Sequence, residues 1–151
     1  DITKLKLFQY FKDRLFPSFD ALDNIGIYPY PFVKETALEI LKKLELGDVC
    51  DRPAAEYSGG MKRRLAIARA LYGCTALHAH KPGEPLLLIM DEPFKGLDPT
   101  LRKKVIDTVD DIVCRTGSAL ILVTHESGEA VALGCEQIAL KPKRRDVNRW
   151  H

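Results

Sequence analysis

Two adjacent carboxylates, Asp91 and Glu92, directly follow the apolar run Leu86 to Met90, which has the length and composition of a buried parallel strand. Open α/β sheets bind their ligands at the carboxyl ends of such strands. Because neighbouring strand-end residues point in different directions, one carboxylate can hold a cation while the other faces a reacting water. We expect Asp91 to hold Mg²⁺ and Glu92 to act as a general base or water positioner. An acidic turn without a ligand is the alternative.

A histidine occupies the equivalent place after a second apolar run. His125 lies two residues beyond the run Ala119 to Val123. If the two runs are parallel strands of one sheet, His125 should lie close to Asp91 and Glu92. An imidazole there can donate to a phosphoryl oxygen or orient a water, although a strand-end histidine can also be purely structural.

A third candidate site is the sequence Ser58-Gly59-Gly60 ahead of an apolar helical pattern. Ser58 is a typical N-cap, and two glycines in the first turn leave backbone N–H groups bare of side chains. Such a helix N-terminus carries the positive end of the helix dipole and can bind an anion. In the alternative, Ser58 only caps the helix, and the cations that follow face solvent (Lys62, Arg63, Arg64 and Arg69).

Elements that could position these residues follow from periodicity and end signals. The pattern predicts strands and helices in alternation over the second half, which implies parallel pairing with right-handed crossovers and an α/β fold. Both central strands are expected to be covered on two faces. The expected strands are 1–9, 86–90, 119–123 and 137–140, and the expected helices are 32–46, 59–72, 98–116 (capped by Asp98 and Pro99) and 128–133.

Composition excludes several classes of protein. Lys and Arg number 23 against 21 Asp and Glu, so the net charge of +2 gives no electrostatic footprint for nucleic acid. No apolar run approaches the roughly 18 residues of a membrane span. The four cysteines form no CxxC pair, so neither a zinc ribbon nor a redox motif is indicated.

The cysteines are expected to be reduced and mostly structural. Cys114 and Cys135 lie in apolar stretches and are expected to be small buried residues. Cys74, His78 and His80 form a C-x3-H-x-H cluster that could bind a metal, but a solvated loop over 73–85 is the favoured interpretation.

The order of these motifs resembles the ATP-binding subunit of ABC transporters. The matching segments are Phe8-Gln9, Tyr57 to Met61, Leu86 to Pro93, Gly96-Leu-Asp98 and Thr124-His125. The resemblance covers nearly the whole chain. It implies a partial P-loop NTPase (RecA-like) parallel sheet with an ABC-type helical subdomain. Residues 1–72 would be the Q-loop and helical subdomain with the signature motif, and residues 73–151 the half of the core that carries Walker B, D-loop and H-switch.

The resemblance also assigns roles to single residues. Asp91 and Glu92 would be the Walker B aspartate and the catalytic glutamate, and His125 the switch histidine. Gln9 would be the Q-loop glutamine, which contacts Mg²⁺ or the attacking water. The implied ligands are ATP and Mg²⁺.

Two further motifs are implied by the same resemblance. Ser58, Gly59 and Gly60 belong to the signature motif, which grips the γ-phosphate of an ATP held by the opposite subunit. Asp98 would be the D-loop aspartate and one of the nucleotide-binding residues. The run Asp91 to Asp98 is similar to the nitrate, sulfonate and taurine importer branch.

The implied function is an ATP-binding and ATP-hydrolysing subunit that couples hydrolysis to solute import. The implied partners are a second ATP-binding subunit in a head-to-tail dimer and transmembrane permease subunits, with no nucleic acid. The implied location is cytoplasmic, peripheral on the inner face of the cell membrane. The aromatic stretch around Phe16 and Phe19 either docks the permease or fills the core of the helical subdomain.

One motif of the family is missing. None of the ten glycines begins the P-loop sequence G-x-x-x-x-G-K-[ST] that cradles the phosphates. In the family this Walker A motif lies upstream, so the chain resembles a subunit cut just before its Q-loop. An in-frame upstream extension of roughly 60–90 residues with this motif would make it a piece of an ordinary transport ATPase. We expect negligible ATP hydrolysis by this chain alone, and an exposed sheet edge with apolar surface.

Two alternatives stay open at this stage. The chain could be a catalytically incomplete partner that donates its signature motif in trans. It could also be a soluble ABC ATPase without a transport role. The 49-residue interval from Gln9 to Ser58 carries no sustained heptads of a coiled coil, which counts against a DNA-repair or chromosome-maintenance ATPase of the same superfamily.

Overall fold

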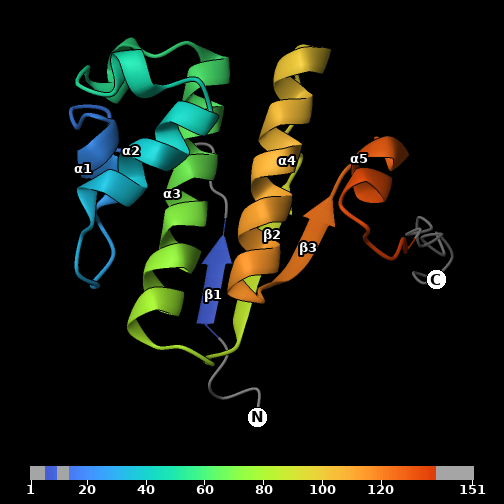
Figure 1. Ribbon diagram of the computed structural model, residues 1–151. Coiled ribbons are helices and arrows are strands. Elements are labelled where there is room, and N and C mark those ends of the chain that lie inside the picture. Colours follow the sequence, from blue (N-terminus) through green and yellow to red (C-terminus); the bar gives the residue numbers. More distant parts are fainter. Residues whose placement is uncertain (1–5, 10–13, 139–151) are drawn as a thin grey trace, which may run out of the picture.

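The computed structural model describes residues 6–9 and 14–138, which form a parallel three-stranded sheet and the helices around it (Figure 1). The strand order is β1-β2-β3, and both pairings are parallel. The α/β class and the parallel sheet expected from the sequence are therefore confirmed. In chain order the elements are β1 (Lys6–Gln9), α1 (Ala21–Ile25), α2 (Lys34–Lys43), the 3-10 helices η2 (Gly47–Val49) and η3 (Ala54–Glu56), α3 (Gly59–His80), β2 (Leu86–Asp91), α4 (Pro99–Thr116), β3 (Ala119–Val123) and α5 (Ser127–Ala132).

Helix α4 begins and ends where its sequence signals predict. The carboxylate of Asp98 accepts hydrogen bonds from the backbone N–H groups of Thr100 (3.1 Å) and Leu101 (3.0 Å), and Pro99 occupies the first turn. Gly117 ends the helix with φ of 63°, a left-handed conformation that glycine adopts without steric cost. These two signals fix where the chain leaves β2 and where it returns to β3.

Helix α3 is longer than the sequence predicts. The expected helix 59–72 continues to His80, so that only residues 81–85 connect it to β2 and the loop expected over 73–85 is wrong. Cys74 is buried in this helix at 1% exposure, because it faces the core rather than a solvated loop. Within residues 6–9 and 14–138 no cluster of His, Cys, Asp and Glu could hold a metal, and no helix there is both long and apolar enough to cross a bilayer.

All four cysteines are free, as expected, but the expectation that Cys114 and Cys135 are buried is wrong. Cys114 is exposed and Cys135 is half-buried, because Cys114 lies on the outer side of α4 and Cys135 follows α5 at the end of the described chain. In the strand expected over 137–140, Gln137 and Ile138 have no regular structure, and residues 139 and 140 lie outside the described part.

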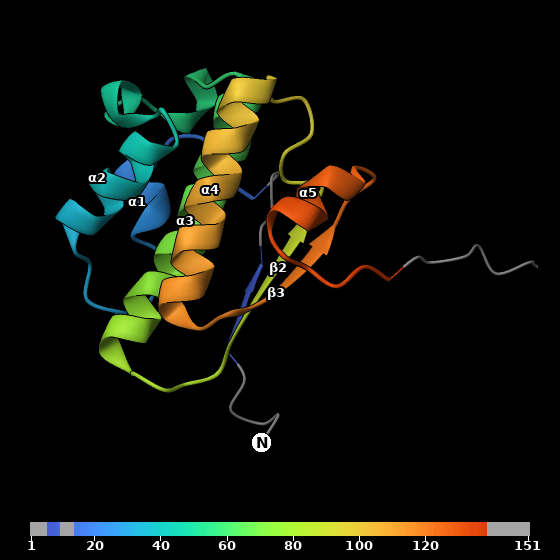
Figure 2. The same cartoon turned by 45° about the vertical axis from the view of Figure 1, so that its right-hand side comes forward.

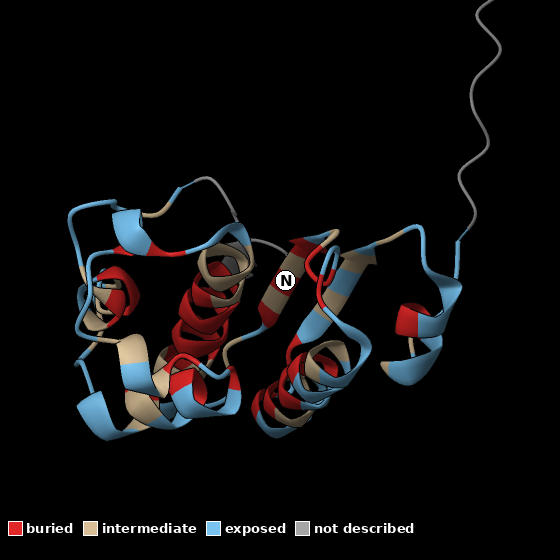
Figure 3. Ribbon diagram, turned by 90° about the horizontal axis from the view of Figure 1, so that it is seen from above, coloured by how far each residue is buried: buried red, intermediate tan, exposed pale blue. Residues whose placement is uncertain are grey.

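The sheet is covered on one face. Leu88 pairs with Leu120 and Met90 with Leu122, so these side chains point to the same face, where the helices pack. Leu88 and Met90 are fully buried there. Figure 3 shows α3 and α4 on the same side of the strands, with no described helix on the other.

The opposite face carries exposed apolar side chains. Ile121 and Val123 are each 49% exposed, and Ile121 pairs with Ile89. The expectation that β2 and β3 are covered on both faces is therefore wrong for the described part of the chain, because no described element packs on this side. The expected apolar exposure is confirmed.

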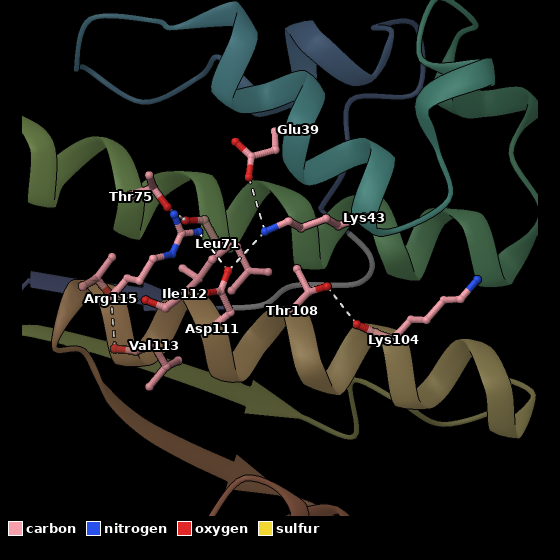
Figure 4. Close-up of polar contacts among 11 residues, drawn as sticks. Glu39, Lys43, Leu71, Thr75, Lys104, Thr108, Asp111, Ile112, Val113 and Arg115 are labelled. Atoms are coloured by element: carbon pink, nitrogen blue, oxygen red, sulfur yellow. Dashed lines mark hydrogen bonds and ion pairs between the residues drawn. The ribbon is translucent and has the colours of Figure 1, made fainter.

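Exposed ion pairs join the helical part of the chain to α4 (Figure 4). Lys43 Nζ lies 3.1 Å from Asp111 and 3.3 Å from Glu39, and Asp111 also pairs with Arg115 at 3.1 Å. A single exposed pair contributes about 0.2–1 kcal/mol, so the shared Asp111 matters as part of a network rather than alone.

Helix α5 lies beyond the end of β3 (Figure 2).

The one-sided sheet gives a stability prediction. Leu88→Ala removes a fully buried side chain and should lower the free energy of unfolding by about 2–5 kcal/mol. The matched change Ile121→Thr, on the neighbouring strand but the uncovered face, should alter it by less than about 0.5 kcal/mol. Urea denaturation followed by circular dichroism measures both, and equal losses would contradict the one-sided packing.

Candidate active site

A carboxylate and an imidazole meet at the carboxyl ends of β2 and β3. Glu92 Oε1 lies 2.9 Å from His125 Nε2. Glu92 is the first residue after β2, and its backbone N–H donates to the carbonyl of Val123 at 2.8 Å. The expectation that parallel pairing brings these two residues together is confirmed by this contact.

Glu92 has a backbone conformation that few side-chain-bearing residues adopt. Its φ is 45°, in the left-handed region, which is strained for a residue other than glycine and is found preferentially at functional sites. The turn ends β2 abruptly and directs Glu92 away from the direction of Asp91. The two adjacent carboxylates therefore lie in different surroundings.

Both oxygens of the Glu92 carboxylate have cationic or hydrogen-bonding neighbours. Lys95 Nζ lies 2.9 Å from Oε2, opposite the His125 contact on Oε1. The hydrogen bond from Lys95 is the main cause that lowers the pKa of Glu92 below its ordinary value. The charges of Lys95, His125 and Arg63 act in the same direction, while desolvation opposes them. In this arrangement Glu92 is an ionised acceptor.

Asp91 is the last residue of β2 and is exposed. It pairs with Val123 across the sheet, so its side chain belongs to the uncovered face with Ile89 and Ile121. Mg²⁺ is commonly held by one or two carboxylates together with phosphate oxygens and water. An exposed carboxylate at a strand end fits that donor set, whereas the described residues form no complete metal cage.

Gln9 ends β1 at the same edge of the sheet. Its backbone pairs with Ile89, two residues before Asp91. The position of its side chain lies outside the described part of the structure. The backbone therefore brings Gln9 to the edge where Asp91 and Glu92 lie, and its contact with a ligand stays a prediction.

The first turn of α3 is open to solvent. Ser58 caps the helix, its Oγ accepting from the N–H of Met61 at 3.2 Å. A Cβ added at Gly59 or Gly60 would meet no atom within 4 Å, and neither glycine has a positive φ. Neither packing nor backbone conformation within the described chain requires glycine here, and the open backbone leaves room for a group to approach from outside.

Sequence reasoning missed the link between α3 and the loop after Glu92. Arg63, in the first turns of α3, donates from Nη1 to the backbone carbonyl of Lys95. Arg63 was expected only as one of several cations along the helix, and Lys95 was not singled out. The only sequence signal was the spacing of Lys95 three residues after Glu92, which a surface lysine also satisfies.

Asp98 lies in the same loop, but its carboxylate is engaged in capping α4. A cavity of about 170 Å³ opens between this loop and the segment after β3, with Glu92, Lys95, His125 and Glu129 among its lining residues. The described chain thus brings Asp91, Glu92 and His125 to one edge of the sheet, whereas Asp98 lies at the start of α4. A bound anion or a positioned water would be accommodated by the cationic and carboxylate groups around this cavity.

Comparison with known proteins gives the family. Residues 4–95 match the family model described as ABC transporter. The aliphatic sulfonates import ATP-binding protein of Agrobacterium fabrum is 37% identical over 129 residues, which are 85% of this chain and 46% of that protein. The Fe(3+) ions import ATP-binding protein of Brucella melitensis is 36% identical over 133 residues, covering 84% of this chain and 35% of that protein.

A solved structure agrees with this match. A dimeric ATP-binding cassette in a post-hydrolysis state, bound to ADP and phosphate, superposes with a TM-score of 0.68 at 26% identity, over 87% of this chain and 57% of that one. The fold is thus that of part of a P-loop NTPase, and the chain spans about half the length of the curated relatives it matches or less. The chain belongs to the ABC transporter family, and among its relatives are the ATP-binding subunits of importers.

Proposed function

We propose that this chain is the part of an ABC importer's ATP-binding subunit that carries the water-positioning glutamate, the switch histidine and the signature motif. The observation that carries the proposal is the 2.9 Å contact between Glu92 Oε1 and His125 Nε2 at the edge of a parallel sheet. Two segments more than thirty residues apart meet there at the site where open α/β sheets bind ligands. The substrate is ATP, and the reaction is hydrolysis of its γ-phosphoryl group.

The chain's own residues would divide the work of hydrolysis. Glu92 holds the attacking water and accepts its proton. The Nε2–H of His125 donates to the Glu92 carboxylate in the absence of nucleotide and to a phosphoryl oxygen once nucleotide is bound. Asp91, with Gln9 beside it on β1, would hold Mg²⁺. The ion would supply charge neutralisation for the phosphate oxygens.

The Lys95 contact adds a condition to this mechanism. Lys95 occupies Glu92 Oε2 and lowers the pKa of the carboxyl, which makes Glu92 a weaker base. For Glu92 to take a proton from water, Lys95 must leave that oxygen, for instance to pair with the phosphate. Lys95 is 70% exposed and can swing away at little cost.

Ser58, Gly59 and Gly60 would contact a nucleotide held by another subunit. The open space around both glycines supports this role, because it leaves room for a ligand to approach the backbone. The helix N-terminus supplies bare N–H groups and the positive end of the dipole. The partner is a second ATP-binding subunit arranged head to tail, with Asp98 near the dimer interface.

An aromatic surface supports docking of a permease at the inner face of the membrane. Phe16 and Phe19 are 46% and 41% exposed, and their rings lie 5.1 Å apart. Buried Asn24 holds this segment through its amide, which bonds the backbone of both phenylalanines (2.8–3.1 Å). Exposed rings on a fixed backbone suit an interface anchor.

The transported solute is of the sulfonate, nitrate or taurine type.

Loss of the Glu92 carboxylate tests the hydrolytic role. The 151-residue chain alone should show no Mg-ATPase activity, because it contains no P-loop sequence. A longer chain with G-x-x-x-x-G-K-[ST] ahead of Gln9 should hydrolyse ATP, and Glu92→Gln should lower its kcat by about 10²–10⁴-fold. Activity of the chain alone that disappears in Glu92→Gln would overturn the need for the missing motif.

Gly60→Ala separates stability from function. Because nothing obstructs a Cβ there, alanine should raise the free energy of unfolding by up to about 1 kcal/mol. The same variant should abolish ATP hydrolysis by the longer chain, since the methyl group blocks the approach of the phosphate. Gly128→Ala is the matched control, with equally open space: it should stabilise to a similar degree and leave activity unchanged. Full activity in Gly60→Ala would contradict the signature role.

Titration of Glu92 tests the contact with Lys95. The folded protein lowers the pKa of Glu92, so this carboxyl stabilises the fold above its ordinary pKa, and that contribution is lost as the pH falls through the lowered value. Lys95→Met should therefore raise the pKa of Glu92, measured by NMR of the side-chain carboxyl carbon. Lys103→Met, which removes a lysine paired with Asp107, is the control and should leave the titration of Glu92 unchanged. An unchanged pKa in Lys95→Met would exclude the contact in solution.

A further inference from the structure

A buried carboxylate lies behind the His125 segment and has no part in the roles assigned so far. Glu129, on α5, is 5% exposed. Its Oε2 accepts a hydrogen bond of 2.6 Å from the hydroxyl of Thr124. Buried carboxylates are rare unless they are paired, so the groups that pair with Glu129 explain how its carboxylate can be buried.

Thr124 directly precedes His125 and organises the turn that carries it. Its hydroxyl donates to Glu129 and accepts from the backbone N–H of Glu126 at 3.0 Å. The same side chain therefore holds the residue after His125 by its backbone. The ring of His125 is 91% exposed, so packing does little to fix it, and its distance from Glu92 depends on the backbone of residues 124–126.

The second partner of Glu129 is Arg102 on α4. Arg102 Nη1 lies 3.9 Å from Glu129 Oε1, and its Nη2 donates to the carbonyl of Leu97 at 3.3 Å. Leu97 lies in the loop between Glu92 and Asp98. Within the described residues, Arg102 Nε is buried without a hydrogen-bond partner, a costly arrangement that the neighbouring negative charge offsets.

We propose that Glu129 is a positioning residue that anchors the Thr124–Glu126 turn to α4 and thereby holds His125 against Glu92. Through Arg102 the same carboxylate joins this turn to the loop that contains Leu97. This inference rests on the proposed role of His125 in ATP hydrolysis. A shift of α4 relative to α5 would change the contact between His125 and Glu92, which makes the switch histidine responsive to the loop at the start of α4.

The anchor can be tested in the 151-residue chain without any nucleotide. Thr124→Val removes the hydroxyl at nearly constant shape, and Thr124→Ser retains it. With the imidazole in its neutral form, NMR of the ring nitrogens should show the proton of His125 on Nε2 in the native chain and in Thr124→Ser. Thr124→Val should give the mixture of tautomers of a free imidazole. The amide of Glu126 should exchange at least about threefold faster in Thr124→Val, the change expected for one lost hydrogen bond.

Variants of the anchor itself complete the test. Glu129→Ala should reproduce the changes of Thr124→Val at His125, and it should add no effect when combined with Thr124→Val. Glu129→Gln keeps an acceptor for Thr124 but loses the charge facing Arg102, so it should disturb His125 less. Asp107→Asn, an exposed carboxylate on α4, is the matched control and should change nothing at His125.

The outcomes separate this inference from the proposed function. If Thr124→Val and Glu129→Ala lower thermal stability but leave the His125 ring signature and the Glu126 amide unchanged, Glu129 is only a structural residue and the inference is overturned. If the ring signature responds as expected while the longer, P-loop-containing chain hydrolyses no ATP, the anchor stands and the proposed function fails. In an active longer chain, Glu129→Ala should lower kcat and leave KM nearly unchanged, because the anchor acts on the catalytic groups rather than on binding.

Discussion

The parallel pairing of β2 with β3 is the constraint on which the site depends. Its register sets Asp91 opposite Val123, and the hydrogen bond from Glu92 N–H to the Val123 carbonyl extends the pairing by one residue. Two chain segments thus end at the same level, and the side chains that follow them are held within hydrogen-bond distance. A slip of one residue would move Asp91 to the covered face and separate Glu92 from His125.

Coverage of only one face of the sheet gives the two carboxylates different surroundings. Leu88 and Met90 are fully buried on the inner face, on the side of α3 and α4, and this burial contributes to the hydrophobic stabilisation of the described chain. Asp91 belongs to the other face, beside exposed Ile121. The relatives are at least about twice as long as the matched part, and this face is where further structure of the family's fold can pack.

Electrostatics around Glu92 connect three separate parts of the chain. Lys95 comes from the loop after β2 and His125 from the segment after β3, while Arg63 reaches the backbone of Lys95 from α3. Because each group approaches from a different element, the charge state and contacts of Glu92 report how those elements are placed relative to one another. Under the proposed function, this carboxylate would respond to movement of α3 as well as to nucleotide.

The sequence alone determined the ends of β2 and β3 to within one residue, the N-cap of α3, both ends of α4 and the candidate residues, because apolar runs, N-cap residues and glycines act over a few neighbouring positions. It also placed Glu92 near His125, since parallel strands end at a common edge. Tertiary structure alone decided how far α3 extends, which face of the sheet is covered, and that Lys95 and Glu129 contact the site. Those features depend on packing between segments far apart in the chain, and a buried glutamate such as Glu129 has the same local pattern as an exposed one.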